Sequence, residues 1–96
     1  MELFIFVRFE ARPGSEDAVA EALGTVLGST RAEPGCLSIH AFRGTRDSHL
    51  FFFHSRWRDE AAFDLHATLP HTRHFLEHVP ELLECPPEIT RTHLLS

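Results

Sequence analysis

Short stretches in which apolar and polar side chains alternate occur four times along the chain, and this alternation predicts strands. The first stretch, Leu3 to Glu10, is apolar on both faces near its start, which indicates a strand covered on both sides. Only the polar stretch Gly44 to Ser48 separates the second from the third, so we expect these two to pair as an antiparallel hairpin. The predicted strands are residues 3–10, 36–43, 50–57 and 88–95.

Apolar residues at helical spacing predict three helices between these strands. The first helix covers residues 15–31 and has one apolar stripe. A second, short helix begins after Asp59, whose carboxylate can accept hydrogen bonds from the free amides of a first turn, and it ends at His66. Pro70 suits the first turn of a third helix, where a missing N–H costs nothing. We expect this last helix to continue to about Glu84, where a Cys-Pro-Pro sequence ends it.

The order β-α-β-β-α-β is the split βαβ arrangement of ferredoxin-like α+β proteins. At this length we expect a single domain, residues 1–96, with an antiparallel four-stranded sheet and helices on one of its faces. The other face would still present Phe, Leu and Ile side chains, and soluble proteins rarely expose so large an apolar surface. The sequence therefore predicts a homodimer in which two sheets pack face to face.

Composition excludes several classes of partner. The net charge of −5 argues against nucleic acid, because phosphate binding requires a basic face. No apolar run approaches the roughly 18 residues of a membrane span, and the apolar start lacks the basic region and cleavage site of a signal peptide. Cys36 and Cys85 form no CxxC motif, so we expect reduced thiols in a cytoplasmic protein.

Most of the candidate chemistry lies between Leu50 and Phe75, where the only tryptophan and several histidines follow the third strand. Trp57 shares a strand face with Phe51, Phe53 and Ser55. Trp57 could form a wall that stacks on a planar substrate, since offset aromatic rings attract one another beyond their burial area. Alternatively, it is a core side chain that closes the sheet against the helices.

His66 is the first candidate for a general base. An imidazole with a pKa near neutrality can take a phenolic proton at pH 7. An ionised hydroquinone gives up an electron to O2 more readily, and an apolar pocket would then protect the reactive intermediate from water. The alternative is a helix-end histidine favoured by the negative end of the helix dipole.

His71, His74 and His78 form one stripe on the last helix, beside Phe75. His71 is the second candidate base and is expected to line a pocket, whereas His74 and His78 are expected at its solvent edge. The spacing of His74 and His78 occurs in some zinc sites. A structural zinc site usually needs four ligands and a catalytic one three protein ligands, so no metal is expected here.

Other polar residues on strands give weaker indications. The Arg8 guanidinium could hold an anionic oxygen of a substrate, because it offers a rigid fork of donors, or it could pair with an acidic side chain. His40 and His54 are expected on adjacent strands, facing one another. The chain has no glycine-rich phosphate loop and no GxSxG motif, so nothing indicates nucleotide binding or a serine nucleophile.

Four segments together carry a family resemblance: ARPG, RAEPGCLSIHAFR, WRDEAAFDLH and LPHTRHF. Their order and spacing resemble the antibiotic biosynthesis monooxygenase (ABM) domain family, including its quinol-monooxygenase-like members. Two positions depart from the family pattern: Ser55 stands where an acid is common, and Thr72 where an aromatic residue is common. The chain contains no tyrosine that could supply a catalytic phenol. The matching positions are Trp57, Asp59, His66, Pro70 and His71.

This resemblance implies a dimeric α/β barrel with a pocket between each sheet and its helices. Some relatives oxidise aromatic polyketides or quinols with O2 and no metal or flavin. Others degrade haem, for which His74 or His78 could be an axial ligand here. The expectation is thus a cofactor-independent monooxygenase acting on a quinol or polyphenol.

Within that expectation, the catalytic residues are Trp57, His66 and His71. The substrate-binding residues are Phe51, Phe53, Ser55, Phe75 and Arg8. Two alternatives stay open. One is a non-catalytic barrel that binds an aromatic ligand or haem. The other is a stress-associated barrel whose main role is to form its dimer interface.

Overall fold

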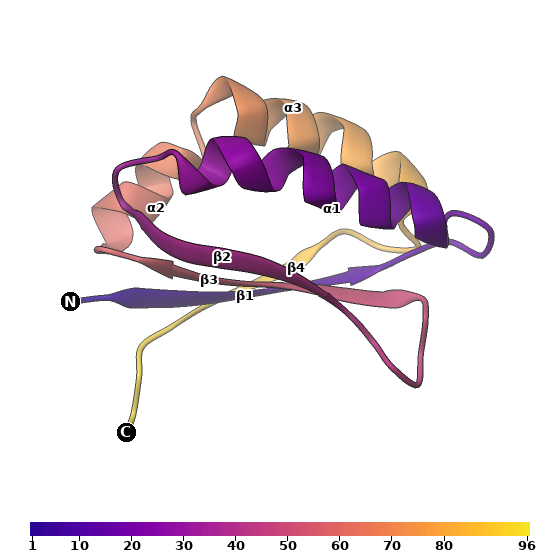
Figure 1. The fold of residues 1–96 in the computed structure, drawn as a ribbon, viewed down its shortest axis with the longest axis horizontal. Helices are drawn as coiled ribbons and strands as arrows, with labels where there is room; N and C mark the ends of the chain where they lie inside the picture. The colour runs from indigo at the N-terminus through magenta and orange to yellow at the C-terminus, as the bar shows by residue number, and fades with distance from the viewer.

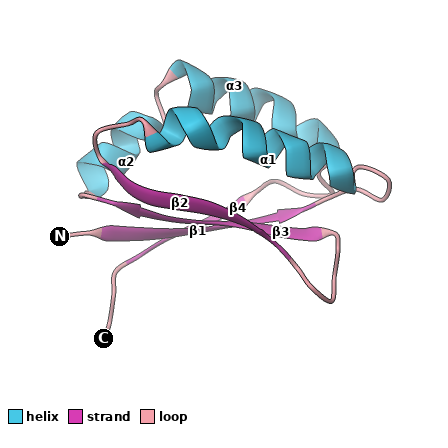
Figure 2. Ribbon diagram, viewed as in Figure 1, coloured by secondary structure: helices cyan, strands magenta, loops and turns pink.

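The computed structural model describes residues 1–96 as a four-stranded sheet with all its helices on one face (Figure 1 and Figure 2). Every strand pair is antiparallel, and the spatial order of the strands is β2-β3-β1-β4. The predicted ferredoxin-like α+β fold is therefore confirmed. The elements are β1 Leu3–Glu10, α1 Glu16–Arg31, β2 Cys36–Arg43, β3 Leu50–Trp57, α2 Glu60–His66, α3 Pro70–His78, the 3-10 helix η1 Val79–Leu82 and β4 Glu88–Thr92.

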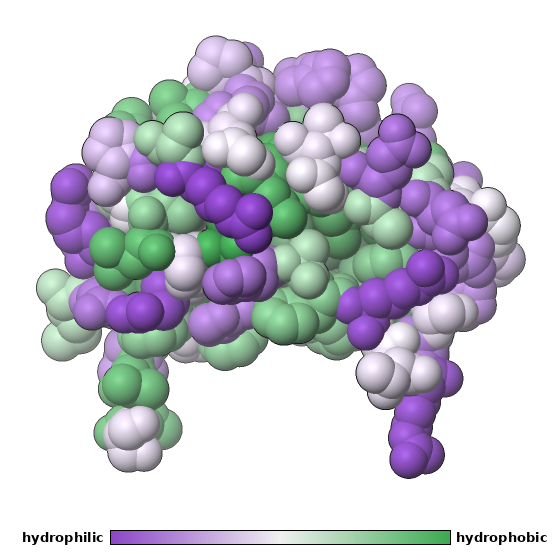
Figure 3. Space-filling view, viewed as in Figure 1, coloured by the Kyte–Doolittle hydropathy of each residue, from purple (hydrophilic) through white to green (hydrophobic).

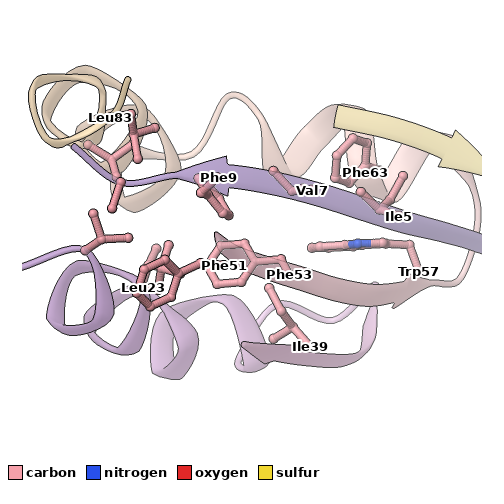
Figure 4. Packing of buried hydrophobic residues seen from close by; sticks show 14 of the residues in the cluster. Ile5, Val7, Phe9, Leu23, Ile39, Phe51, Phe53, Trp57, Phe63 and Leu83 are labelled. Carbon is pink, nitrogen blue, oxygen red and sulfur yellow. The ribbon is translucent and has the colours of Figure 1, made fainter. Parts of the chain in front are cut away.

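The core fills the space between the sheet and the helices. β1 and β3 alternate strictly between buried and more exposed residues, as the period of two along a strand requires. Their inward aromatic rings pack edge to face, with the Phe9 and Phe53 centroids 5.1 Å apart. Figure 4 shows this layer, in which Leu23 from α1 and Ile39 from β2 lie beside the inward side chains of the two central strands.

The last helix is shorter than predicted. α3 ends at His78 and passes into η1 instead of continuing to Glu84. The physical reason is Pro80, which has no N–H for an α-helical hydrogen bond and whose ring crowds the preceding turn. The apolar spacing continues across Pro80, so periodicity alone predicts a longer helix.

The chain after η1 is joined to the end of β1. The Arg12 amide donates to the Leu82 carbonyl at 2.9 Å, and the Glu84 amide donates to the Glu10 carbonyl at 2.8 Å. The Arg12 side chain adds a third hydrogen bond, from Nε to the Leu83 carbonyl at 2.9 Å. These bonds fix the far end of the helical layer to the sheet.

The last strand also ends earlier than predicted, at Thr92 instead of Leu95. Thr92 pairs with Phe4, so the continuing register would place Leu94 opposite Glu2, which precedes β1. Without a partner strand, Leu94 and Leu95 remain exposed.

The sheet face opposite the helices is partly apolar and uncovered. Phe6 and Phe42 are 48% and 51% exposed on this face, and with Phe52 and His54 they border a shallow hollow. His40 and His54 are register partners on it, as predicted. The C-terminal tail and the β2–β3 loop project beyond this face at opposite ends of the sheet (Figure 1).

Polar residues cover the outer side of the helices, whereas apolar atoms form a band between the helices and the sheet (Figure 3). None of the helices combines the length and the apolar character needed to cross a bilayer.

Candidate functional site

A cavity of about 220 Å³ lies between the inner face of the sheet and the helices. Its walls are mostly hydrophobic and come from every strand and from all three α-helices. Phe53, Phe63 and Phe75 contribute aromatic walls, and Ile89 and Arg91 line it from β4. An engineered protein cavity of about 150 Å³ admits benzene, so this one has room for a small aromatic molecule.

Three hydroxyl-bearing residues line the cavity, Thr30, Ser55 and Thr72, and the first two lie in opposite layers. Ser55, on β3, is 2% exposed and accepts a hydrogen bond from Nε1 of Trp57 at 3.0 Å. Thr30, near the end of α1, is 1% exposed, and its hydroxyl has no hydrogen-bond partner within the protein. A buried hydroxyl without a partner costs free energy, so Thr30 provides an anchor for a polar group of a ligand.

One carboxylate joins two histidines beside the cavity. Oε2 of Glu33 lies 2.7 Å from Nδ1 of His66 and 2.7 Å from Nε2 of His71. Because a carboxylate oxygen only accepts, both ring nitrogens donate to it. The Thr72 hydroxyl lies 3.1 Å from the same His66 nitrogen. This arrangement fixes the tautomer of His66 and leaves its Nε2 unprotonated when the ring is neutral.

Local sequence explains how these residues meet. Asp59 caps α2 through a 2.8 Å hydrogen bond from the Ala62 amide, as predicted, and Pro70 occupies the first turn of α3. The Glu33-Pro34-Gly35 turn packs directly on α2, because a Cβ atom on Gly35 would lie 2.4 Å from the Cβ of Ala62. Glycine at this position therefore allows Glu33 to approach His66.

The environment keeps His66 neutral at neutral pH. Burial lowers the pKa of His66 below its usual range, and hydrogen bonding and charge attraction from Glu33 oppose that shift. The His66 side chain is 14% exposed and that of Glu33 only 8%. A neutral imidazole held by a carboxylate can accept a proton at the nitrogen that the carboxylate does not occupy.

Comparison with known families identifies the chain. Residues 3–78 match the family model described as "Antibiotic biosynthesis monooxygenase". The protein belongs to the antibiotic biosynthesis monooxygenase family. The resemblance seen in the sequence is thus confirmed over most of the chain.

Three curated proteins are similar to this chain in sequence. "Uncharacterized protein sll1783" of Synechocystis is 31% identical over 80 residues, which cover 83% of this chain and 54% of that protein, about half its length. "Putative monooxygenase Rv0793" of Mycobacterium tuberculosis is 33% identical over 90% of this chain and 84% of its own. "Putative monooxygenase YcnE" of Bacillus subtilis is 32% identical over 98% of this chain and 95% of its own.

The solved structure of Rv0793 superposes on this protein with a TM-score of 0.94. The superposition covers 100% of this chain and 97% of Rv0793, at 28% identity in the structural alignment. The agreement of the two folds extends from β1 through β4.

The structure places four of the predicted site residues on the cavity wall of this family member: Phe53, Ser55, His66 and Phe75. Trp57 does not line the cavity. It lies behind His66, with ring centroids 4.6 Å apart, and is 1% exposed. His71 reaches the cluster through Glu33 but lines a separate groove between α1 and α3.

Two residues that the sequence predicts to bind substrate, Arg8 and Phe51, do not line this cavity. Arg8 is on the opposite face of the sheet, where it pairs with Glu10 at 3.5 Å. Phe51 is buried toward the outer end of β3, below the guanidinium of Arg43 at 5.0 Å from its ring. The sequence predicted the strands that carry both residues. It did not predict which face of β1 borders the cavity, or how far the cavity reaches along β3.

Sequence reasoning missed Thr30 and Glu33 as site residues, and among the arginines on strands it favoured Arg8 over Arg91. Thr30 lies on the apolar stripe of α1, and a threonine among buried positions was the only available signal. Glu33 precedes Pro34-Gly35, a dipeptide typical of turns, and nothing else in the sequence marks it. Arg91 stacks on Phe63 at the cavity and pairs with Asp64 at 2.7 Å. His74 and His78 line the α1–α3 groove, outside the cavity.

Proposed function

We propose that this protein is a monooxygenase that oxidises a small quinol or polyphenol with O2 and without a metal or organic cofactor. The observation that carries the proposal is a mostly apolar cavity with a neutral, carboxylate-held histidine in its wall. The names of the relatives from Mycobacterium tuberculosis and Bacillus subtilis support the general class of reaction. The quinol substrate is our inference from the resemblance to the quinol-monooxygenase-like members of the family, and a base beside an apolar cavity is compatible with it.

His66 acts as the general base in this proposal. Glu33 holds the Nδ1–H of His66, so that Nε2 is free to accept the phenolic proton of the substrate. A base placed in this way contributes about 10²–10⁴-fold to a rate. Trp57 is a positioning residue, because its ring packs against that of His66 from the core side.

The cavity binds and orients the substrate. Phe53, Phe63 and Phe75 offer ring faces and edges to an aromatic molecule. The hydroxyl of Thr30 can pair with a hydroxyl or carbonyl group of the substrate, and so gain the hydrogen bond that it lacks within the protein. Apolar walls keep water from the ionised intermediate.

The overall reaction balances without an external reductant. A hydroquinone and O2 give a hydroxyquinone and water. The phenolate left after proton transfer passes an electron to O2, and the resulting radicals combine to form a ring carbon–oxygen bond. Cleavage of the O–O bond then releases one oxygen atom as water and leaves the other on the ring, so the substrate supplies all the electrons.

We also propose that the protein works as a homodimer joined through the open face of the sheet. Phe6 and Phe42 are half-exposed there beside Phe52, and monomeric proteins rarely leave such a patch uncovered. The projecting β2–β3 loop and the C-terminal tail flank this face (Figure 1). The tail carries two exposed leucines, Leu94 and Leu95, which a second copy could cover.

Oxygen uptake and isotope incorporation test the activity. Purified protein is mixed with menadiol and a panel of related quinols in an oxygen electrode, and product formed under ¹⁸O2 is analysed by mass spectrometry. We expect uptake above the buffer rate and one labelled oxygen atom in the product. His66→Ala should lower kcat by about 10²–10⁴-fold, and Thr30→Val should mainly raise KM.

His74→Ala is the matched control, because His74 is an exposed histidine of α3 outside the cavity, and its activity should equal that of the native protein. The proposal fails if no quinol in the panel gives protein-dependent oxygen uptake. Product that carries no label would show an oxidase that releases peroxide instead. Saturable quinol binding without turnover would favour the non-catalytic barrel.

A further inference from the structure

The cluster of Glu33, His66 and His71 has the composition of a metal site. Two imidazoles and one carboxylate are the protein ligands of several catalytic zinc and non-haem iron centres. We propose that these three residues bind one divalent first-row transition metal ion, with Zn²⁺ and Fe²⁺ as the expected ions. This inference goes beyond the proposed oxidation, which needs no metal.

The ligand atoms already converge. Oε2 of Glu33, Nδ1 of His66 and Nε2 of His71 all lie within 4.8 Å of one another, and the carboxylate oxygen is 2.7 Å from each nitrogen. Ligands bound tetrahedrally at about 2.0–2.1 Å are about 3.3 Å apart, so Oε2 of Glu33 would move about 0.6 Å further from each nitrogen. The two nitrogens, which lie within 4.8 Å of one another, would adjust to the same spacing. The Glu33 side chain extends from a turn and can make this adjustment.

Burial and charge favour a cation at this position. The three side chains are only 8%, 14% and 26% exposed, which weakens the competition from water for the ligand atoms. One carboxylate between two imidazoles gives a negative site, and attraction between charges is stronger in a partly dry environment. The Thr72 hydroxyl, 3.1 Å from Nδ1 of His66, is the nearest additional oxygen.

The histidine pair that the sequence analysis considered for zinc is a poorer candidate. His74 and His78 stack with ring centroids 4.1 Å apart, but Nδ1 of His78 is already bonded to the His74 carbonyl. Both residues are exposed, and no third ligand converges on them. The exposed pair His74 and His78 therefore serves as an internal control for the site that contains His66 and His71.

A bound ion would change the role of His66. Coordination through Nδ1 displaces the hydrogen bond to Glu33 and moves the ring proton to Nε2, so the imidazole can no longer accept a phenolic proton. The metal would then be a regulator that switches off the proposed oxidation, and not a cofactor for it. Binding can be measured without any substrate, so failure of the metal site and failure of the oxidation are separate results.

Trp57 provides a direct reporter of binding. It is the only tryptophan of the chain, and its ring lies 4.6 Å from that of His66. The native protein is freed of metal with a chelator and titrated with Co²⁺, which quenches nearby tryptophan emission and gives visible absorption that reports its coordination. We expect saturable quenching with one ion per chain, reversal of the Co²⁺ bands by Zn²⁺, and no response to Mg²⁺. Fe²⁺ is tested under anaerobic conditions as a second competitor.

Variants separate this site from the exposed pair. Glu33→Gln, which keeps the side-chain shape, and His71→Gln should each weaken Co²⁺ binding at least about tenfold. The double variant His74→Ala/His78→Ala should bind Co²⁺ as the native protein does. Circular dichroism verifies that the variants used for the comparison are folded.

Absence of saturable binding to the native protein at millimolar Co²⁺ would overturn the proposal. So would affinity that survives Glu33→Gln but disappears in the His74/His78 double variant, since the ion would then lie on the outside of α3.

Discussion

Single residues of the same type differ here because their surroundings differ. Cys36, at the start of β2, is partly buried and pairs in register with Trp57, whereas Cys85 is exposed beyond η1. Burial raises the pKa of the Cys36 thiol, and the nearby Glu33 carboxylate acts in the same direction, against a smaller effect of Arg31. The thiolate is the reactive form, so Cys36 should be the less reactive cysteine.

We predict that iodoacetamide at pH 8 modifies Cys85 faster than Cys36, because Cys36 is partly buried and its raised pKa lowers the fraction of reactive thiolate. The Cys36 rate should keep rising above pH 9, since its raised pKa delays ionisation. Peptide mass mapping over time measures both rates. Cys85→Ser serves as the control with one slow site, and equal rates at the two cysteines would contradict the argument.

The sequence could identify His66 at residue scale, because a titratable ring at a helix end beside aromatic residues is unusual. It could not identify Thr30 or Glu33. Thr30 acquires its meaning only when β1, β3 and α3 enclose the space beside it, and Glu33 only when its turn packs on α2. Arg8, which lies on the sheet face opposite the cavity, shows the same limit, since period-two alternation defines two faces but does not say which one borders a cavity.

Among the elements, the short turn of residues 33–35 before β2 connects several parts of the site. Gly35 contacts Ala62 of α2, and the Arg58 amide donates to the Gly35 carbonyl at 2.9 Å. These contacts join the start of β2 to the corner between β3 and α2. The turn therefore fixes the distance between Glu33 and His66.

Glycine-to-alanine substitutions in two elements should change the free energy of unfolding in opposite directions. Gly35→Ala should lower the free energy of unfolding by about 1–3 kcal/mol, because its Cβ would meet Ala62 at 2.4 Å and force the turn away from α2. Gly28→Ala, within α1 with open space around the added methyl group, should raise it by about 1 kcal/mol. Urea unfolding followed by circular dichroism measures both changes. A neutral Gly35→Ala would mean that the turn does not pack on α2 as described.

The sequence predicted a helix boundary correctly where a capping residue marks it. Asp59 predicted the start of α2 because a carboxylate before a helix has one clear use. The end of α3 was missed because apolar spacing was weighed above the backbone chemistry of Pro80. The early end of β4 depends on the length of its partner β1, which alternation within residues 88–95 cannot reveal.

For the whole molecule, the open sheet face leads to a prediction about assembly. The native protein should sediment at micromolar concentration with twice the 11.0 kDa mass of one chain. Phe6→Asp combined with Phe42→Asp should give a single chain, because two charges would be buried at the interface without partners.

Leu65→Asp is the matched control, since Leu65 is 61% exposed on α2, and it should leave the mass unchanged. A native protein that sediments as one chain would remove the dimer from the proposed function while leaving the cavity intact.

The overall architecture was predictable because many residues carry the same pattern, so no single position decides the fold. Four alternating stretches and the helical segments between them admit few arrangements once the split βαβ order is recognised. The cavity was not predictable to the same degree. It is a residual space between layers, and its extent depends on a few side chains from distant parts of the chain.

The hydrogen bonds that join Arg12 and Glu84 to their partners have a mechanical consequence. They tether one end of the helical cover to β1, so the cover cannot lift evenly from the sheet. The other end of the cover, where α2 meets α3, is also held, because Glu33 bonds to both His66 and His71 and Gly35 packs on α2. With the cover fastened at both ends, the uncovered side of the cavity is the edge strand β4, where the lining residue Ile89 is 49% exposed.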